Sequence, residues 1–489
     1  MSRPGTFLGA VALLCLACGD AADDTTNATG GPSTSQSPAT GDTTDVAPTS
    51  TASETTDPTT TSSEATTAET TTAETTDPTS TTGAGELTPR AIIGGSSCTC
   101  VLWNDDTFRC WGKGEGLACT GWGEALLEDI GDDEAPASVG DVPAPYATAD
   151  LGIGNHSCAV TVDGEVRCWG DNDDGELGMG TLNQPAKSAA EAEAAFVGPN
   201  AASVAIGEGH TCAVFTDGAL RCWGQNSHGE LGYGHTDNIG DDEVPLLSGS
   251  VAIGGKAVQV VAGGASLGGA HTCVLLEGGA VRCFGWTAAG SAGSGVLGYG
   301  NLDDIGDDEL PTSVGPLKLG GPVSRLSAGA RHTCALRTDG ALVCWGVNGD
   351  GQLGLGHTDD IGDDEVPDPA GIVSLAQPAI DVAATFQGTC VLLEDGAVQC
   401  WGFGELGTHG AGHVMNLGDD ETPLDFGPVD IGGAPAVQIA AGRYHVCALL
   451  ADSALRCWGF NATGQLGYGN TDNIGDDETP ASAGDVLYR

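Results

Sequence analysis

Basic residues are scarce in this 489-residue chain, which has 16 lysines and arginines against 67 aspartates and glutamates. The formal charge of −51 excludes nucleic acid as a partner, because proteins gain affinity for a polyanion by replacing its counterions with Lys and Arg side chains. The same charge argues against adsorption to an anionic membrane surface. It favours solubility and cationic partners, and it carries no information about the fold.

Aromatic residues and long apolar runs are also few. Aromatics make up 5% of the chain, and no stretch after the N-terminus approaches the ~20 apolar residues of a membrane-spanning helix. The sequence has neither Gly-x4-Gly-Lys-Ser/Thr nor His-Glu-x-x-His, so it gives no sign of a phosphate loop or a zinc-protease helix. Glycine, in contrast, occurs 79 times, which indicates many short strands joined by tight turns.

The N-terminus has the pattern of an export signal. Arg3 precedes an apolar run at 8–17 that is too short to span a bilayer. A small residue then precedes Cys18, which resembles a bacterial lipobox, although Cys15 stands where such boxes usually carry leucine. Residues 1–18 therefore predict a lipoprotein at the outer membrane, cell surface or periplasm, lipidated on Cys18 and touching the membrane through this lipid only. A plain secretory signal is the alternative.

Residues 19–90 consist almost wholly of Thr, Ser, Ala, Pro, Gly, Asp and Glu. Such a segment cannot bury enough apolar surface to offset its conformational entropy, so we expect a disordered linker. The repeats that follow place the folded domain at 91–489.

A Cys-x9-Cys pair recurs seven times, with the first cysteines 54 to 61 residues apart. In one copy, apolar-alternating stretches flank Thr338-Asp339-Gly340, the chemistry of a tight hairpin. Folding about this turn places 336 opposite 342 and Cys334 opposite Cys344. Cross-strand Cβ atoms lie about 4.5–5.5 Å apart, which is close enough for a disulfide.

Each hairpin continues through Trp-Gly or Phe-Gly, and in six repeats a Gly-x-Leu-Gly turn follows. A repeat of about four strand-length segments cannot bury its apolar faces alone, so neighbours must stack. The expected fold is all-β, a seven-bladed β-propeller, with a linear β-solenoid as the less suitable alternative. Residues 478–486 nearly repeat 134–142, which predicts a final strand that seals the ring against the first blade.

The order Gly-x-x-His-x-Cys-Ala-Leu, Asp-Gly, Cys-Trp-Gly, Gly-Gln-Leu-Gly resembles the repeat of the regulator of chromosome condensation family. The resemblance covers 91–489 and implies a seven-bladed propeller. Family members include an exchange factor for a small GTPase and secreted bacterial proteins, which present loops to protein partners. This chain differs in its export signal, its paired cysteines and its few basic residues, and no active residue of the family maps onto it.

The cysteines are expected to form one disulfide within each hairpin, because exported proteins sustain disulfides and zinc needs four ligands that converge. Two further cysteines in the first repeat predict an eighth bridge. The predicted pairs are Cys100–Cys110, Cys158–Cys168, Cys212–Cys222, Cys273–Cys283, Cys334–Cys344, Cys390–Cys400, Cys447–Cys457 and Cys98–Cys119.

An acidic motif, Ile-Gly-Asp-Asp-Glu-x-Pro or a close variant, occurs in every repeat except the second, which carries 185–195 instead. One interpretation is a solvated loop in which Asp caps a turn and Pro starts the next strand. Another is calcium, a hard cation that takes clustered carboxylates, and a third is an acidic docking ring for a basic partner. The calcium ligands would be Asp132, Asp133, Glu134, Asp241, Asp242, Glu243, Asp307, Asp308, Glu309, Asp363, Asp364, Glu365, Asp419, Asp420, Glu421, Asp476, Asp477 and Glu478. No other cofactor is predicted.

A histidine stands two residues before the first cysteine in five repeats, and we predict that it is a structural hydrogen-bonding group. These are His156, His210, His271, His332 and His445. Gly264-Ala-Ser266-Leu-Gly268 matches the nucleophile-elbow pattern, but the pattern is meaningful only between a strand and a helix.

These observations predict a monomeric module that binds a protein or a glycan, with no catalytic residues. Segments 181–199, 264–270 and 286–296 break the repeat, so specific contacts are expected there first. The alternative is an enzyme acting on envelope polysaccharide, which would need a cluster of carboxylates or histidines in the channel. Guanine nucleotide exchange follows from family analogy alone and conflicts with export.

Overall fold

The computed structural model describes residues 86–114, 119–183, 186–264, 270–287 and 294–489. The chain divides into two units, 1–80 and 81–489, and all described residues lie in the second. The predicted signal, Cys18 and nearly all of the predicted linker therefore lie outside the described residues. Within the described part, no helix is long and apolar enough to cross a bilayer.

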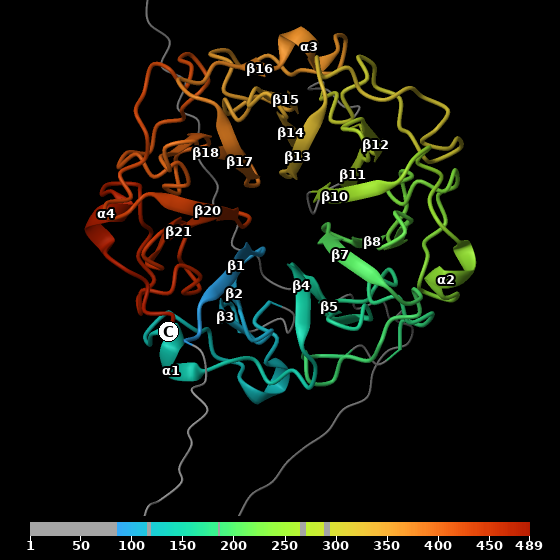
Figure 1. Ribbon diagram of the computed structural model, residues 1–489, viewed down its shortest axis with the longest axis horizontal. Helices are drawn as coiled ribbons and strands as arrows, with labels where there is room; N and C mark the ends of the chain where they lie inside the picture. Colours follow the sequence, from blue (N-terminus) through green and yellow to red (C-terminus); the bar gives the residue numbers. More distant parts are fainter. Residues whose placement is uncertain (1–85, 115–118, 184–185, 265–269, 288–293) are drawn as a thin grey trace, which may run out of the picture. The chain divides into compact units, whose positions relative to one another are not determined.

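Seven antiparallel sheets, called blades 1 to 7 in chain order, surround a central axis, as Figure 1 shows. The all-β, seven-bladed propeller predicted from the repeats is confirmed. The strands are β1 (Pro89–Gly94), β2 (Cys98–Trp103) and β3 (Phe108–Gly112); β4 (Thr148–Ile153), β5 (His156–Thr161) and β6 (Val166–Gly170); β7 (Ala201–Ile206), β8 (His210–Phe215) and β9 (Leu220–Gly224); β10 (Ala257–Gly264), β11 (Ala270–Leu276) and β12 (Val281–Gly285); β13 (Val323–Ala328), β14 (His332–Arg337), β15 (Leu342–Gly346) and β16 (Ile372–Val373); β17 (Ala379–Ala384), β18 (Gly388–Leu393) and β19 (Val398–Gly402); β20 (Ala436–Ala441), β21 (His445–Leu450) and β22 (Leu455–Gly459).

The hairpin of each blade has the register that the sequence predicts. In blade 5, Leu336 pairs with Leu342 and Cys334 with Cys344. The fourth segment of a blade is shorter than expected, because it is usually a single bridge such as Gly346–Ile361. Among the described residues, only blade 5 adds a short fourth strand, β16. The first strand of blade 1 begins at Pro89, two residues before the predicted start of the domain.

Neighbouring blades bury the tryptophan of the Cys-Trp-Gly sequence between them. Trp345 is fully buried, and its indole N–H donates to the carbonyl oxygen of Val296 in the preceding blade at 3.0 Å. Trp401 donates to Gln352 in the same way. This repeated contact shows why a blade needs its neighbours, since its largest apolar side chain is covered by the preceding blade.

Four short helices follow the acidic motif, where the sequence predicted that proline would start a strand. They are α1 (Pro136–Val139), α2 (Pro245–Ser248), α3 (Pro367–Ala370) and α4 (Pro480–Ala483). Each has proline in its first turn, where the missing N–H costs nothing because that group has no partner inside the helix.

The prediction that the C-terminal segment is a closing strand is wrong. After α4 the chain packs on its own blade, with the Val486 N–H donating to Leu455 at 3.0 Å. Tyr488 then stacks on Trp103 of blade 1, with ring centroids 5.7 Å apart. The ends of the domain thus meet through side chains and loops, and each blade contains only consecutive strands.

Candidate binding face

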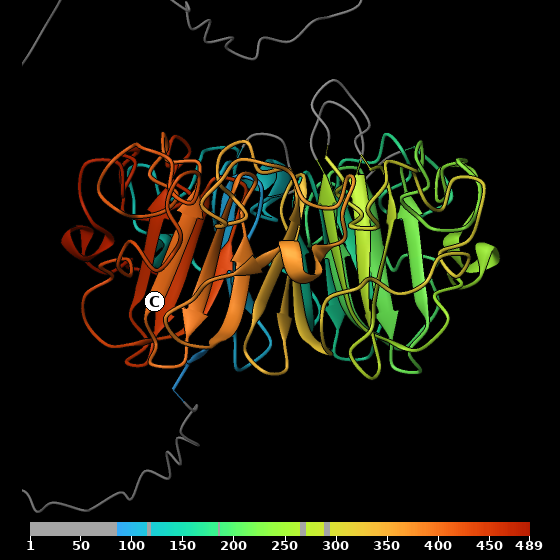
Figure 2. The ribbon, with the colours of Figure 1, turned by 90° about the horizontal axis from the view of Figure 1, so that it is seen from above.

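One end of the propeller is formed by the turns that join the first and second strands of each blade. We call these the inner turns and this end the inner-turn face. The described inner turns are 95–97, 154–155, 207–209, 329–331, 385–387 and 442–444. Because the first strands lie nearest the axis, these turns converge there (Figures 1 and 2).

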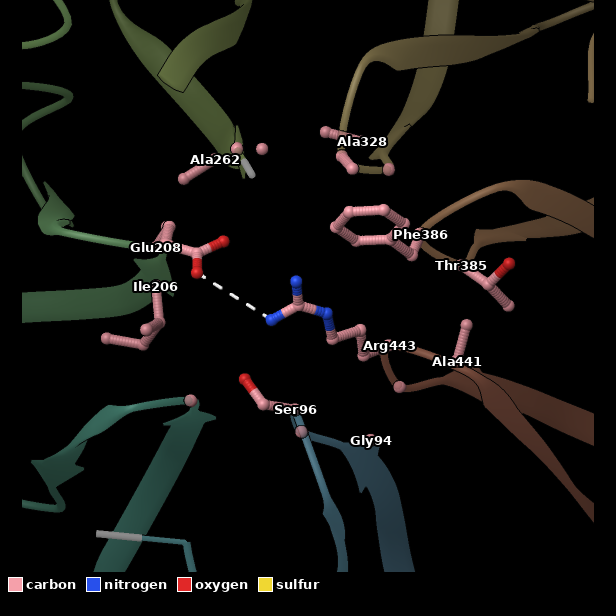
Figure 3. Close-up of a pocket in the computed structure, with 18 of the residues that line it drawn as sticks. Gly94, Ser96, Ile206, Glu208, Ala262, Ala328, Thr385, Phe386, Ala441 and Arg443 are labelled. Carbon is pink, nitrogen blue, oxygen red and sulfur yellow. Dashed lines mark ion pairs between the residues drawn. The ribbon is translucent and has the colours of Figure 1, made fainter. Parts of the chain in front are cut away.

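A pocket of about 200 Å³ lies where the inner turns meet. Most of its lining is glycine and alanine, so backbone and small side chains leave the space open. Figure 3 shows the larger side chains that line it, among them Ser96, Ile206, Glu208, Thr385, Phe386 and Arg443. They come from blades 1, 3, 6 and 7, which are far apart in the sequence.

Arg443 is the central group of this pocket. Its Nη1 lies 3.7 Å from the Glu208 carboxylate, and its guanidinium carbon lies 4.5 Å from the centre of the Phe386 ring. The Phe386 and Tyr444 rings are 5.2 Å apart. Stacking of this kind holds a guanidinium in place while leaving its edge available for polar contacts.

The pocket does not contain the catalytic cluster that the enzyme alternative requires. Among the described lining residues, Glu208 is the single carboxylate and none is a histidine. A glycosidase-type mechanism needs two carboxyl groups at a defined separation.

Backbone hydrogen bonds tie several inner turns together. The N–H of Phe386 donates to the carbonyl of Arg443 at 2.8 Å, and the N–H of Arg443 donates to Gly95 at 3.1 Å. Ala330 donates to Phe386 in the same direction at 3.4 Å. The turns of blades 5, 6, 7 and 1 therefore form a connected belt around half of the axis.

The blade histidines lie behind this face and form interblade contacts. His332 Nε2 lies 3.0 Å from the Thr389 hydroxyl of the next blade, and that hydroxyl donates to the Gln352 carbonyl at 2.9 Å. Because the hydroxyl proton goes to the carbonyl, the histidine must donate its Nε2 proton. His156, His210, His271 and His445 make the equivalent contact with Thr211, Thr272, Thr333 and Thr99.

Burial keeps these histidines neutral. It lowers the pKa of His156 and His271 to about 3 and that of His210, His332 and His445 to about 4. They pair with threonines around the ring and do not converge on one point, so the arrangement agrees with the structural role that the sequence predicts.

The acidic motif also joins blades. In blade 5, Ile361 bridges Gly346 of its own blade, and the carbonyl of Gly362 then accepts from the N–H of Gly300 in blade 4 at 3.0 Å. Gly362 has φ +106°, and a Cβ there would lie 2.4 Å from the carbonyl oxygen of Gly295, so only glycine fits. The same contact occurs at six of the seven interfaces, through the glycines at 131, 240, 306, 362, 418 and 475.

The carboxylates of this motif are close together. In five copies, each of the three side chains offers a carboxylate oxygen, and these three oxygens all lie within 4.8 Å of one another. Asp363, Asp364 and Glu365 form one such group. Partial burial and a hydrogen bond to Asp364 raise the pKa of Glu365 to about 7. Three oxygen donors fit a hard cation but supply only part of the six to eight that Ca²⁺ takes, so calcium stays a prediction.

Eight disulfides have the pairing that the cysteine spacing predicts. Seven join the second and third strands of a blade, each with a Cα–Cα distance of 4.1 Å. The eighth, Cys98–Cys119, has a Cα–Cα distance of 5.8 Å. Cys98 occupies the position that histidine takes in five other blades.

The eighth disulfide lies at the interface that lacks the other two contacts. Blade 2 has no acidic motif, and blade 1 has no histidine to reach blade 2. There, Cys119 anchors a segment in which the Gly121 carbonyl accepts from the N–H of Ala189 at 3.0 Å.

Two sequence expectations fall partly outside the described residues. Ser266 of the nucleophile-elbow pattern lies in 265–269, and the divergent segments include 184–185 and 288–293. In turn, sequence reasoning missed Glu208, Phe386 and Arg443. A signal was available in the sequence, since Glu208 and Arg443 stand at a variable position of Gly-x-x-His and Phe386 occupies the equivalent position in Thr385-Phe386-Gln387-Gly388.

Comparison with known proteins identifies the family. Residues 121–484 match the RCC1-like domain. The chain is 29% identical over 393 residues to the ultraviolet-B receptor UVR8 of Arabidopsis thaliana, covering 78% of this chain and 80% of that protein. It is 30% identical over 260 residues to the human E3 ubiquitin-protein ligase HERC2, covering 52% of this chain but only 5% of the ligase.

Solved structures agree on the fold. Yeast RCC1 (Prp20), solved in complex with Kap60, superposes with a TM-score of 0.59 at 19% identity, covering 81% of this chain and 85% of that one. Human WBSCR16 superposes with a TM-score of 0.54 at 20% identity, covering 70% and 83%. Since the RCC1-like match spans most of the propeller, the chain belongs to the RCC1-like domain family.

Proposed function

We propose that this protein is an exported, lipid-anchored propeller that binds a protein partner through its inner-turn face. One observation carries this proposal: the repeats agree where they build the fold and differ where they form this face. Glycine, histidine, threonine and the disulfide recur from blade to blade. The two residues before the histidine position change from blade to blade. The first is Ser96, Gly154, Glu208, Ala330, Phe386 or Arg443, and the second is Ser97, Asn155, Gly209, Arg331, Gln387 or Tyr444.

A repeat that varies at exposed or half-buried positions between recurring structural ones has side chains there that the fold does not require. In repeat proteins, such positions usually form the binding surface. The relatives point in the same direction, because yeast RCC1 was solved with Kap60 and Prp20p has been characterised for binding to Gsp1p and histones. These contacts belong to those proteins, and they support a protein partner here in kind only.

Photo-crosslinking in the full-length chain tests the proposal. A photoreactive residue would replace Gln387 or Asn155 on the inner-turn face, or Thr338 or Asp395 in exposed turns at the other end of blades 5 and 6. We expect one crosslinked protein from the first pair and none from the second. Crosslinks from the second pair alone would place the binding face at the other end of the propeller. Crosslinks from neither pair would reject a protein partner.

Export is supported by the eight disulfides, which persist in oxidising compartments, and anchoring by the lipobox-like residues before Cys18. Fractionation of the producing cells tests the anchor. We expect Cys18→Ser to move the protein from the membrane pellet to the soluble fraction, whereas the control Cys15→Ser keeps it in the pellet. An unchanged distribution of Cys18→Ser would exclude lipidation at this residue.

A further inference from the structure

The aromatic residues on the surface are gathered on one part of the inner-turn face. In the described part of the chain, six aromatic side chains are at least partly exposed and are not packed against the hydrophobic cores. One of them, Phe196, lies elsewhere. The other five are Trp286, Phe386, Phe403, Tyr444 and Phe460.

Backbone contacts place these residues next to one another. The residue after the Trp-Gly or Phe-Gly of a blade donates its N–H to that blade's inner turn: Phe460 donates to Tyr444 at 2.8 Å and Phe403 to Gln387 at 2.9 Å. Val347 donates to Arg331 at 2.9 Å. The five aromatic residues therefore form an arc over blades 4 to 7 together with Val347, Arg331 and Arg443, which we call the crescent.

The same positions in blades 1 to 3 are polar. Lys113, Asp171 and Gln225 follow the Trp-Gly sequences there, each donating its N–H to an inner turn, and Asn155 and Glu208 stand in two of those turns. The face is thus divided into an apolar, arginine-bearing part and a polar part. Backbone geometry does not impose this division, because the equivalent residues have equivalent backbone contacts.

Arg331 has an unusual position for an arginine in a chain of charge −51. It is exposed, its guanidinium carbon lies 5.5 Å from the centre of the Trp286 ring, and its side chain makes no hydrogen bond or ion pair with any residue that the structure describes. Arg331 and Arg443 are the only charged residues of the crescent. Arg443 already faces the Glu208 carboxylate at 3.7 Å, whereas Arg331 interacts with Asp360 only at longer range. Arg331 is therefore the cation of the crescent that complements a carboxylate of a partner.

The crescent also has the composition of a protein-binding surface. Interface centres are enriched in Trp, Tyr, Phe and Arg and depleted of Lys, Glu and Asp, and Trp, Tyr and Arg dominate binding energy. The hydrogen-bonded belt of inner turns holds much of this surface in place before binding, which lowers the entropy cost of association.

We propose that the crescent docks a protein segment that presents a carboxylate side chain between aromatic or aliphatic side chains, with Arg331 receiving the carboxylate. The proposal rests on the protein-binding function above and names its partner chemistry. The partner group expected at the crescent is negatively charged, whereas the acidity of the whole chain favours positively charged partners. Short-range contacts at the crescent, and not long-range attraction, would then select the partner.

Selection from a randomised 12-residue peptide library on the immobilised full-length protein tests this. We expect enriched peptides to combine Asp or Glu with Phe, Leu or Trp, and to bind at least as tightly at 300 mM NaCl as at 50 mM, because salt screens repulsion by the acidic chain. Arg331→Gln, Phe403→Ser and Phe460→Ser should each weaken binding at least tenfold. The matched controls Lys113→Ser and Gln225→Ser occupy, on the polar part, the positions equivalent to Phe403 and Phe460, and they should change binding less than twofold.

Enrichment of Lys- or Arg-rich peptides whose binding weakens with salt would overturn the proposal in favour of docking on the acidic loops. Absence of enrichment, or peptides that are insensitive to the three crescent substitutions, would overturn it as well. These outcomes are separate from the photo-crosslinking result, which can still show a protein partner on another part of the same face. Unchanged melting temperatures would show that each variant is folded.

Discussion

At the residue scale, buried polar pairs join the blades, and each pair has a defined proton arrangement. The threonine hydroxyl donates to a carbonyl of the preceding blade and accepts from that blade's histidine, so one residue joins two groups across the interface. Such a contact stabilises mainly because losing it would leave a buried donor without a partner.

Replacing Thr389 by valine tests this contact. The variant leaves the Nε2 proton of His332 without an acceptor, while the Gln352 carbonyl keeps its bond from the Trp401 indole. We expect the free energy of unfolding to fall by about 1–3 kcal/mol, measured by urea denaturation with the disulfides intact. The control Thr338→Val, at an exposed turn, should change it by less than about 0.5 kcal/mol. Equal effects of the two substitutions would contradict the structural role of the histidine pair.

Two sets of residues give stability opposite dependences on pH. The folded pKa values of the histidines lie below their ordinary 6.5, so unfolding takes up protons and stability falls as the pH drops from 6.5 towards 4. Glutamates of the acidic motif have pKa values raised from 4.5 to about 7, so the folded state holds protons that the unfolded state releases. Their contribution falls as the pH rises from 4.5 to 7.

Glu365→Gln removes one glutamate from this balance. Because the charged form of Glu365 is disfavoured in the folded state, the variant should be more stable than the wild type at pH 8, by about 1–2 kcal/mol after allowance for solvent screening. The difference should shrink towards zero at pH 4. A stability difference between Glu365→Gln and the wild type that stays constant across this pH range would show that the pKa of Glu365 is not raised.

At the scale of elements, the turn residues of each hairpin predict its strand pairing, but they do not predict which residues join neighbouring blades. The Asp339-Gly340 turn fixes the pairing of 336 with 342, and everything needed for that inference lies within ten residues. The short helix at Pro480 was mistaken for a strand, because similarity to 134–142 gives equivalence of position but not the conformation of either copy. The histidine was correctly interpreted as structural, but its partner is a threonine of the next blade, 55–62 residues away in four blades and 346 residues away for His445, where the ring closes.

The interface between blades 1 and 2 offers an element-scale prediction. Cys98→Ser combined with Cys119→Ser should lower the free energy of unfolding by about 2–4 kcal/mol, and Cys158→Ser combined with Cys168→Ser should have a similar effect. Hydrogen exchange should separate the two. Only the first pair should speed exchange at Ala189, whose N–H bonds to Gly121 beside Cys119. Unchanged exchange at Ala189 would show that the disulfide does not support this interface.

At the scale of the whole molecule, the number of blades follows from the sequence, but the arrangement of side chains around the axis does not. Phe386, Arg443 and Ser96 meet because blades 6, 7 and 1 are neighbours in a closed ring, and 290 residues separate Ser96 from Phe386 along the chain. Counting repeats gives seven blades, and only the closed ring shows which variable positions share one surface. The crescent is therefore a property of the assembled propeller.

The net charge of −51 gives the last prediction, because carboxylates held together by folding repel one another more than in the extended chain. The screening length falls from about 30 Å at 0.01 M salt to about 3 Å at 1 M, so NaCl should raise the melting temperature over this range. CaCl₂ at matched ionic strength separates screening from binding, because each acidic cluster brings three carboxylates within 4.8 Å. If these clusters take calcium, CaCl₂ should raise the melting temperature well beyond NaCl, and Asp363→Asn should reduce that excess. Equal dependence of the melting temperature on NaCl and CaCl₂ would exclude calcium binding. The motif would then act only through its backbone contact between blades, which requires the glycine and not the carboxylates.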